Sequence, residues 1–282
     1  MSARLPRTLL MLLAAVTLLV ATPGGAAAKD PLEASDPKIT TKSPSASLPG
    51  YDISYPQCGD PFPAPFDFVI VGVNGGRVYS ANPCLGDGFG PSQLAWAGRD
   101  AALYANTGNP GPELSSYWPH GQTTPRACDT DANPGDDTLE CAYDYGWNAA
   151  ADSYRIAVEA YISLGWAEPG ATRTPVANDW WLDVEIANSW RDDPELNVAA
   201  LKGAVDYLDS VGARSVGFYS APHMWRDIVG DTTAFDGLPS WHAGARTLRG
   251  ARANCDDPSI TGGELALTQY LDGGFDANHV CR

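Results

Sequence analysis

The chain has 282 residues, of which 44% are hydrophobic and only 18% are charged, a composition typical of a folded globular protein and not of a disordered chain. Its 34 acidic and 18 basic residues give a formal net charge of −16, which disfavours nucleic acid and anionic membranes as partners because clustered Lys and Arg bind both. The 9 Trp and 12 Tyr suit a large aromatic core, and they also suit carbohydrate binding, in which sugar rings lie flat on aromatic faces.

The N-terminus predicts a secretory signal peptide at residues 1–28. Arg4 and Arg7 supply its positive start, an apolar stretch runs from Leu9 to Val20, and Ala26–Ala28 form a small-residue cleavage site. The apolar stretch is short for a membrane span, and no second long apolar segment follows. We therefore expect a secreted, extracellular protein that has no membrane contact after signal removal and could associate with a cell wall.

Residues 29–49 predict a disordered linker. They are rich in Ser, Pro, Lys, Thr and Asp and contain almost no large apolar side chain. The remaining residues, 50–282, have the length of one α/β barrel, and no internal repeat divides them. We expect a single folded domain there.

The 6 cysteines are spread widely and include no C-x-x-C pair, which indicates structural disulfides and not zinc or redox chemistry. Sequence alone leaves about fifteen pairings open. Proximity along the chain favours neighbours, which gives the pairs Cys58 with Cys84, Cys128 with Cys141, and Cys255 with Cys281.

The first half of the domain predicts three strands and one short helix. Strands are expected at residues 50–54, 68–73 and 102–106, and a helical segment at 92–98. The uninterrupted apolar run at 68–73 is typical of a strand that is buried on both faces of a parallel sheet. A long polar excursion then extends to Cys141, as in a functional or disulfide-held loop.

The second half alternates helices and strands, which favours parallel pairing with right-handed crossovers. Residues 144–164 and 194–211 have helical spacing, and Asp193 and Gly212 are suited to cap the second helix. The strands are expected at 180–186, 215–219, 240–243 and 266–270. The last third offers no room for full helices.

The strand at 180–186 carries two carboxylates on alternate residues. Asp183 and Glu185 would face one side, while Leu182, Val184 and Ile186 would face the other. Two acids this close resist ionising together, so one should keep its proton near neutral pH. Cleavage of a glycosidic bond needs one protonated and one ionised carboxyl group. An acidic edge strand with solvated carboxylates is the alternative.

Further acids lie at strand ends in the remainder of the chain. If the sheet closes as a barrel, the C-terminal ends of its strands converge on one mouth. Asp52 and Asp276 would then join Asp183 and Glu185, with Asp272 nearby. Each of these additional acids could instead serve only to form a turn.

Other chemistries find less support. The chain lacks a G-x-S-x-G nucleophile motif, and Gly86–Gly90 lacks the setting of a dinucleotide-binding loop. The four His, at positions 120, 223, 242 and 279, do not have metal-ligand spacing. We expect neither a metal nor another cofactor.

Five segments occur in the order of known family landmarks: Gly50–Ser54, Phe68–Val71, Leu182–Glu185, Gln269–Tyr270 and Phe275–Asn278. Together they resemble glycoside hydrolase family 25, the Chalaropsis-type lysozymes, which are secreted N-acetylmuramidases that cut peptidoglycan. The resemblance covers roughly residues 50–282 and implies an irregular TIM-type (β/α)5(β)3 barrel.

The resemblance also implies roles for individual residues. Glu185 would be the general acid, and Asp183 would stabilise the positively charged sugar intermediate. Asp52 and Asp276 would position and tune the site. The residues expected to contact the sugar are Tyr219, Trp241 and Gln269.

This sequence departs from the family pattern after the first strand, where it continues as Tyr55-Pro56-Gln57-Cys58. With the three cysteine pairs, this places it closer to a divergent branch of secreted bacterial glycoside-hydrolase-like domains. The first hypothesis is a secreted, monomeric glycosidase of lysozyme type acting on peptidoglycan or a related amino-sugar glycan. A non-catalytic wall-binding protein on the same barrel is the alternative, and an exported enzyme for another glycan is a third.

Overall fold

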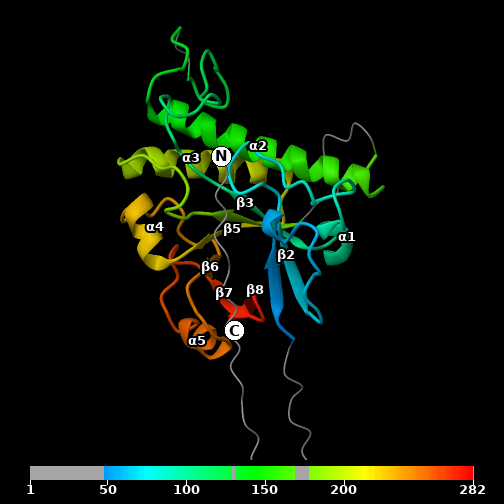
Figure 1. Ribbon diagram of the computed structural model, residues 1–282. Helices are drawn as coiled ribbons and strands as arrows, with labels where there is room; N and C mark the ends of the chain where they lie inside the picture. The colour runs from blue at the N-terminus through cyan, green and yellow to red at the C-terminus, as the bar shows by residue number, and fades with distance from the viewer. Residues whose placement is uncertain (1–47, 129–130, 169–177, 282) are drawn as a thin grey trace, which may run out of the picture. The chain divides into compact units, whose positions relative to one another are not determined.

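The computed structural model describes residues 48–128, 131–168 and 178–281, which form a closed barrel of eight strands in chain order (Figure 1). The predicted signal peptide and residues 29–47 of the predicted linker lie outside the described residues. Among the described residues, no helix combines the length and the apolar character that crossing a membrane requires.

Seven of the strands run parallel and the eighth closes the barrel in the opposite direction. Strand β8 is antiparallel to both β7 and β1. The strands are β1 (Gly50–Ile53), β2 (Phe68–Gly72), β3 (Ala102–Asn106), β4 (Asp179–Asp183), β5 (Ser215–Ser220), β6 (Ser240–His242), β7 (Leu265–Asp272) and β8 (Phe275–Val280).

The helices are unevenly distributed, so the predicted irregular barrel is confirmed. Only a 3₁₀ turn, Tyr55–Gln57, follows β1, and no helix separates β7 from β8. The helices are α1 (Gln93–Ala97), α2 (Leu139–Ser163), α3 (Pro194–Val211), α4 (Pro222–Val229) and α5 (Leu248–Asn254). The prediction that the last third has no room for full helices agrees with the shortness of α4 and α5, which have 8 and 7 residues.

The boundaries of the two long helices test the capping argument. Helix α3 begins and ends as predicted: the Asp193 side chain accepts a hydrogen bond from the Glu195 N–H, and Gly212 ends the helix in the left-handed region. Helix α2 begins five residues earlier than expected. The side chain of Thr138 caps it there, and its first turn includes the half-cystine Cys141. The prediction was based on the helical spacing further along the helix and did not use the Thr138 cap.

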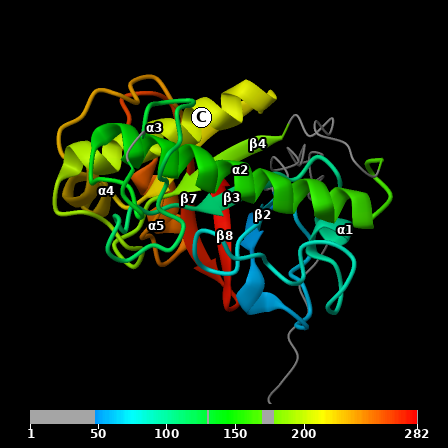
Figure 2. The same cartoon turned by 90° about the horizontal axis from the view of Figure 1, so that it is seen from above.

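Helices α2 and α3 lie side by side over one side of the barrel (Figures 1 and 2). Glycines permit their close approach. A Cβ atom at Gly146 would lie 1.7 Å from the Ala200 carbonyl oxygen, and one at Gly203 would lie 2.0 Å from the Tyr143 carbonyl oxygen. Backbone therefore meets backbone at this crossing, and no larger side chain fits there.

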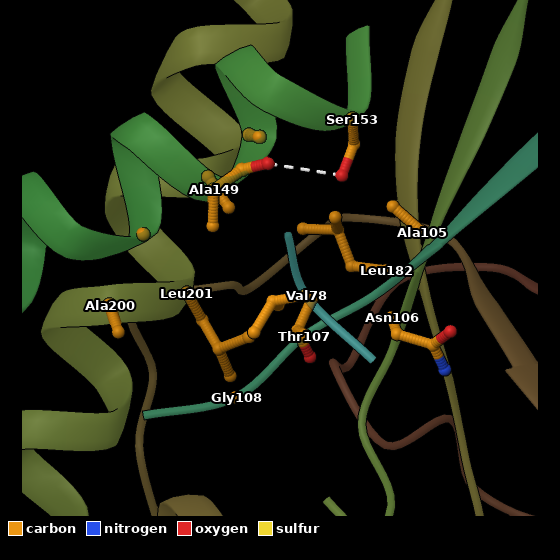
Figure 3. Close-up of a pocket in the computed structure, with 13 residues that line it drawn as sticks. Val78, Ala105, Asn106, Thr107, Gly108, Ala149, Ser153, Leu182, Ala200 and Leu201 are labelled. Carbon is orange, nitrogen blue, oxygen red and sulfur yellow. Dashed lines mark hydrogen bonds between the residues drawn. The ribbon is translucent and has the colours of Figure 1, made fainter. Parts of the chain in front are cut away.

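A small void remains between these helices and the ends of β3 and β4 (Figure 3). It measures about 10 Å³, and its lining includes Leu182, Ala200 and Leu201. At its edge, the Ser153 hydroxyl donates to the Ala149 carbonyl, 3.0 Å away. A void of this volume scarcely holds one water molecule, so the interface is packed and is not a ligand site.

Side chains alternate between the two faces of the barrel wall. On β4, Trp180 and Leu182 point outward into the core beneath the helices, whereas Trp181 points inward. Inside the barrel, Trp181 packs with Trp241, Ile70 and Leu267. These side chains fill the interior, which is therefore a packed core and not a pore.

All three predicted disulfides are present. They join Cys58 to Cys84, Cys128 to Cys141 and Cys255 to Cys281. Each closes a loop of 13 to 26 residues, which in the chain-entropy model contributes about 3 kcal/mol of stability.

We expect Gly146→Ala to lower the free energy of unfolding by at least about 1 kcal/mol, because the strain of separating α2 from α3 exceeds the helix propensity gained. Urea unfolding followed by circular dichroism measures this. The matched control is Gly250→Ala in α5, where the nearest atoms to an added Cβ are 3.5 Å away. That change should stabilise the protein by about 0.5–1 kcal/mol. Equal effects at the two glycines would contradict the close-packing argument.

Candidate active site

Asp52 and Asp276 face each other across the seam that closes the barrel. They are register partners on β1 and β8, so their side chains share the inward face. The Asp52 carboxylate accepts hydrogen bonds from Asn278 Nδ2 at 2.6 Å and from Gln269 Nε2 at 3.1 Å. Burial, followed by the nearby charge of Asp276, raises the pKa of Asp52 to about 7.

Asp183 ends β4 and is 5% exposed. One carboxylate oxygen accepts a hydrogen bond from Asn106 Nδ2 at 2.6 Å, and the other has no partner among the described residues. Burial raises the pKa of Asp183 well above its usual value, and the charge of Glu185 adds to this effect. The hydrogen bond from Asn106 opposes the shift but does not cancel it.

Glu185 lies two residues beyond the end of β4 and is half-buried. The Val184 N–H still donates to the Tyr219 carbonyl at 2.9 Å, which extends the strand-like alternation by one residue. Burial raises the pKa of Glu185, and the charge of Asp276 raises it further. The expected alternation then stops: Ile186, predicted to pack with Leu182 and Val184, is 57% exposed because the chain leaves the sheet.

The phenol of Tyr219 is close to the carboxyl groups of all four acids. The pKa of Tyr219 is raised well above its usual value by burial and then by the charges of Glu185, Asp52, Asp183 and Asp276. The structure thus brings together, at the C-terminal mouth of the barrel, acids from β1, β8 and the end of β4. Asp272 is not among them, because it accepts a hydrogen bond from the outward-facing Tyr51 hydroxyl.

Gln269 links this phenol to the acids. The Tyr219 hydroxyl donates to Gln269 Oε1 at 2.8 Å, and Gln269 donates in turn to Asp52. Trp241, expected to contact the sugar, is only 2% exposed. Its ring packs against Tyr219 with centroids 4.4 Å apart and against Trp181 at 5.8 Å. Trp241 therefore supports the site from within the barrel and does not line an open cleft.

Sequence reasoning missed three neighbours of the acids. Asn106 and Asn278 hold Asp183 and Asp52, and burial raises the pKa of Tyr104, with Asp52, Asp183 and Asp276 adding to the shift. Asn106 ends β3, so the rule that strand ends meet at the mouth could have found it. Asn278 faces inward two residues after Asp276, as strand alternation predicts.

The chemistry of this cluster follows from its desolvation. Carboxyl groups with raised pKa values can hold and donate protons near neutral pH, and those that ionise stabilise a neighbouring positive charge. Among the described residues, no group of three or more His, Cys, Asp and Glu is arranged to hold a metal ion. The arrangement is suited to acid-assisted cleavage through a cationic intermediate, as in glycoside hydrolysis.

Known proteins similar to this chain include two proteins of glycoside hydrolase family 25. No protein-family model matches the chain, but a probable family 25 lysozyme of Dictyostelium discoideum is 36% identical over 96 residues. Over those 96 residues the chain is similar to a family 25 lysozyme. The match covers 33% of this chain and spans 42% of the length of that relative. It confirms the resemblance to family 25 that was predicted from the sequence landmarks.

A solved family 25 structure also aligns with the barrel. This glycosyl hydrolase 25 of Streptococcus pneumoniae is described as a virulence factor that participates in host cell invasion. The alignment covers 83% of this chain and 86% of that one, with 14% identity and a TM-score of 0.41.

The raised pKa of Asp52 predicts a pH-dependent stability. Its folded-state pKa of about 7 lies above the unfolded value of 3.8, so the folded protein holds this proton more tightly. The contribution is complete below pH 3.8 and is lost as the pH rises to about 7. The free energy of unfolding should therefore fall over this range, and it should fall less in Asp52→Asn.

Urea unfolding at a series of pH values tests this difference. The exposed Asp60 provides the matched control, since Asp60→Asn should keep the wild-type pH dependence. If wild type and Asp52→Asn lose the same amount of stability from acid to neutral pH, the proton whose release lowers the stability is not on Asp52.

Proposed function

We propose that the protein is a secreted glycosidase of lysozyme type that hydrolyses peptidoglycan or a related amino-sugar glycan, acting as a monomer. The observation that carries the proposal is the contrast between Glu185 and Asp183. Both have raised pKa values, but Glu185 is half-buried whereas Asp183 is 5% exposed. The more accessible acid is the one that can reach a glycosidic oxygen.

Glu185 is proposed as the general acid. No described side chain donates a hydrogen bond to its carboxyl group. Its proton is therefore available to the leaving oxygen, and burial favours its retention by raising the pKa of Glu185. The glycosidic bond breaks as the oxygen is protonated, and positive charge develops on the sugar ring.

Asp183 is proposed to stabilise that positive charge. Its unpartnered oxygen is buried, so its negative charge would act on the cationic sugar, or on the N-acetyl group of the substrate, through a site of low dielectric constant. Asn106 fixes the other oxygen. Once the site contains a cation, the ionised form of Asp183 is favoured. Asp52 and Asp276 tune these two groups through their charge, and Tyr219 and Gln269 are proposed to contact the sugar.

Export is part of the proposal. Three disulfides are typical of proteins that fold in an oxidising compartment, and family relatives include a lysozyme. The predicted signal peptide at residues 1–28 supports the same location.

A second candidate is supported by the same pKa values. Asp52, Asp183, Glu185 and Asp276 are all shifted upward, and a fully protonated cluster lacks the anion that the reaction needs. Such a cluster could hold a glycan by hydrogen bonds without cleaving it. The alternative is therefore a non-catalytic wall-binding protein on the same barrel.

We expect Glu185→Gln to lower the rate of wall hydrolysis by a factor of about 10²–10⁴ while leaving glycan binding intact, because the amide keeps the shape but cannot donate the proton. Release of reducing ends, with mass analysis of the products, measures hydrolysis, and sedimentation with insoluble walls measures binding. Glu264→Gln, at an exposed position just before β7, is the matched control and should retain full activity.

Two outcomes would overturn the proposal. Wild-type protein that binds walls but releases no reducing ends would establish the binding protein instead. Hydrolysis of an amino-sugar-free glycan, with none of peptidoglycan, would establish an enzyme for another polysaccharide.

A further inference from the structure

A groove of about 650 Å³ lies at the same end of the barrel as the acids. Its walls come from the segments that follow the C-terminal ends of β2, β3 and β4. This volume is within the range of natural ligand sites. The groove adjoins the much smaller void of Figure 3, since Val78, Thr107 and Gly108 line both.

The groove is joined to the acids through shared backbone. Thr107 lines the groove, and its hydroxyl donates to the carbonyl of Asp183. Asn188 lines it as well, and its N–H donates to the carbonyl of Glu185 at 3.0 Å. A ligand in the groove would therefore lie next to the loop that carries the proposed acid.

The charge of the groove is opposite to that of the protein. None of the described residues that line it is Asp or Glu, and Arg77 is its one charged residue. Arg77 is exposed and forms no ion pair with the described residues. In a chain of net charge −16, a carboxylate-free groove with an available guanidinium group suits an anionic ligand.

Two stacked tyrosines form the aromatic part of the groove. The rings of Tyr79 and Tyr117 lie 4.1 Å apart at an angle of 7°, and Tyr117 is 56% exposed. Tyr79 has a φ of 56°, the one positive value among the described non-glycine residues. Its hydroxyl donates to the Tyr145 carbonyl at 3.4 Å. Backbone strain of this kind concentrates at functional sites. Here it positions the Tyr79 ring, which supports the exposed ring of Tyr117.

We infer that this groove binds the part of the glycan adjacent to the cleaved bond, and that Arg77 pairs with a carboxylate carried by that part. A sugar ring would lie on the exposed face of Tyr117, while Thr107 and Asn188 offer hydrogen bonds. The inference rests on the proposed function for the reaction, but the binding it describes does not require catalysis. It also accounts for an acidic protein acting on an anionic polymer.

Binding in the Glu185→Gln background tests the inference without any need for turnover. Isothermal titration would compare soluble peptidoglycan fragments whose carboxylates are free with fragments whose carboxylates have been converted to amides. We expect the free carboxylates to bind about three- to fivefold more tightly, the size of an exposed charge pair. Arg77→Gln should remove this preference, and Arg77→Lys should restore most of it. Tyr117→Ala should weaken both ligands alike.

Fragments stripped of their peptides distinguish the source of the carboxylate. If the Arg77-dependent preference for free carboxylates survives removal of the peptides, the carboxylate is on the sugar. If the preference disappears, the carboxylate is on the peptide. Either result supports the inference. Arg249→Gln, an exposed arginine on α5, is the matched control and should change nothing.

Two results would overturn the inference. One is equal affinity for free and amidated fragments in Glu185→Gln protein that keeps Arg77. The other is a loss of affinity in Arg77→Gln that is equal for both kinds of fragment. These results are separable from failure of the proposed function. If the wild-type protein shows the Arg77-dependent preference but no hydrolysis, the inference about the groove stands and the proposed enzymatic function fails.

Discussion

The chemistry of this protein depends on the removal of water from carboxyl groups at the mouth of the barrel. Burial is the largest cause of the raised pKa at each of Asp52, Asp183, Glu185 and Asp276, and mutual repulsion adds to it at the first three. The water is excluded from below by the aromatic side chains of the interior, including Trp181 and Trp241. The core of the barrel therefore sets the protonation state of the site.

The site also requires that the last strand, β8, run in the reverse direction. Because β8 runs antiparallel to β1, it places Asp276 directly opposite Asp52 and Asn278 within reach of the same carboxylate. A parallel eighth strand would bring only the residues at its C-terminal end to the mouth. The antiparallel hairpin of β7 and β8 instead supplies Gln269 and Asn278 from within the two strands and Asp276 from the start of β8. The departure from regular barrel symmetry is thus what assembles the polar network.

The stabilising elements lie apart from this network. The close contact of α2 and α3 at Gly146 and Gly203 is on the outer face of the barrel, and the disulfide between Cys128 and Cys141 ties the long loop after β3 to the start of α2. That loop also forms part of the groove that contains Tyr117. Support from the disulfide and from α2 keeps this wall in place beside acids that themselves reduce stability when they ionise.

The sequence by itself determined the approximate positions of β1 to β7, the capped helix α3 and the identities of the four acids, because alternation, capping chemistry and strand ends are local signals. Closeness along the chain favoured the three disulfide pairs that the structure has, but it did not exclude the other pairings. It could not place the start of α2, the exposure of Ile186 or the burial of Trp241, since these depend on where the chain leaves the sheet and on which side chains fill the barrel. Nor could it pair Asn106 with Asp183, or Asn278 and Gln269 with Asp52. Only closure of the barrel brings residues separated by up to 226 positions within hydrogen-bonding distance, and desolvation arises from that closure.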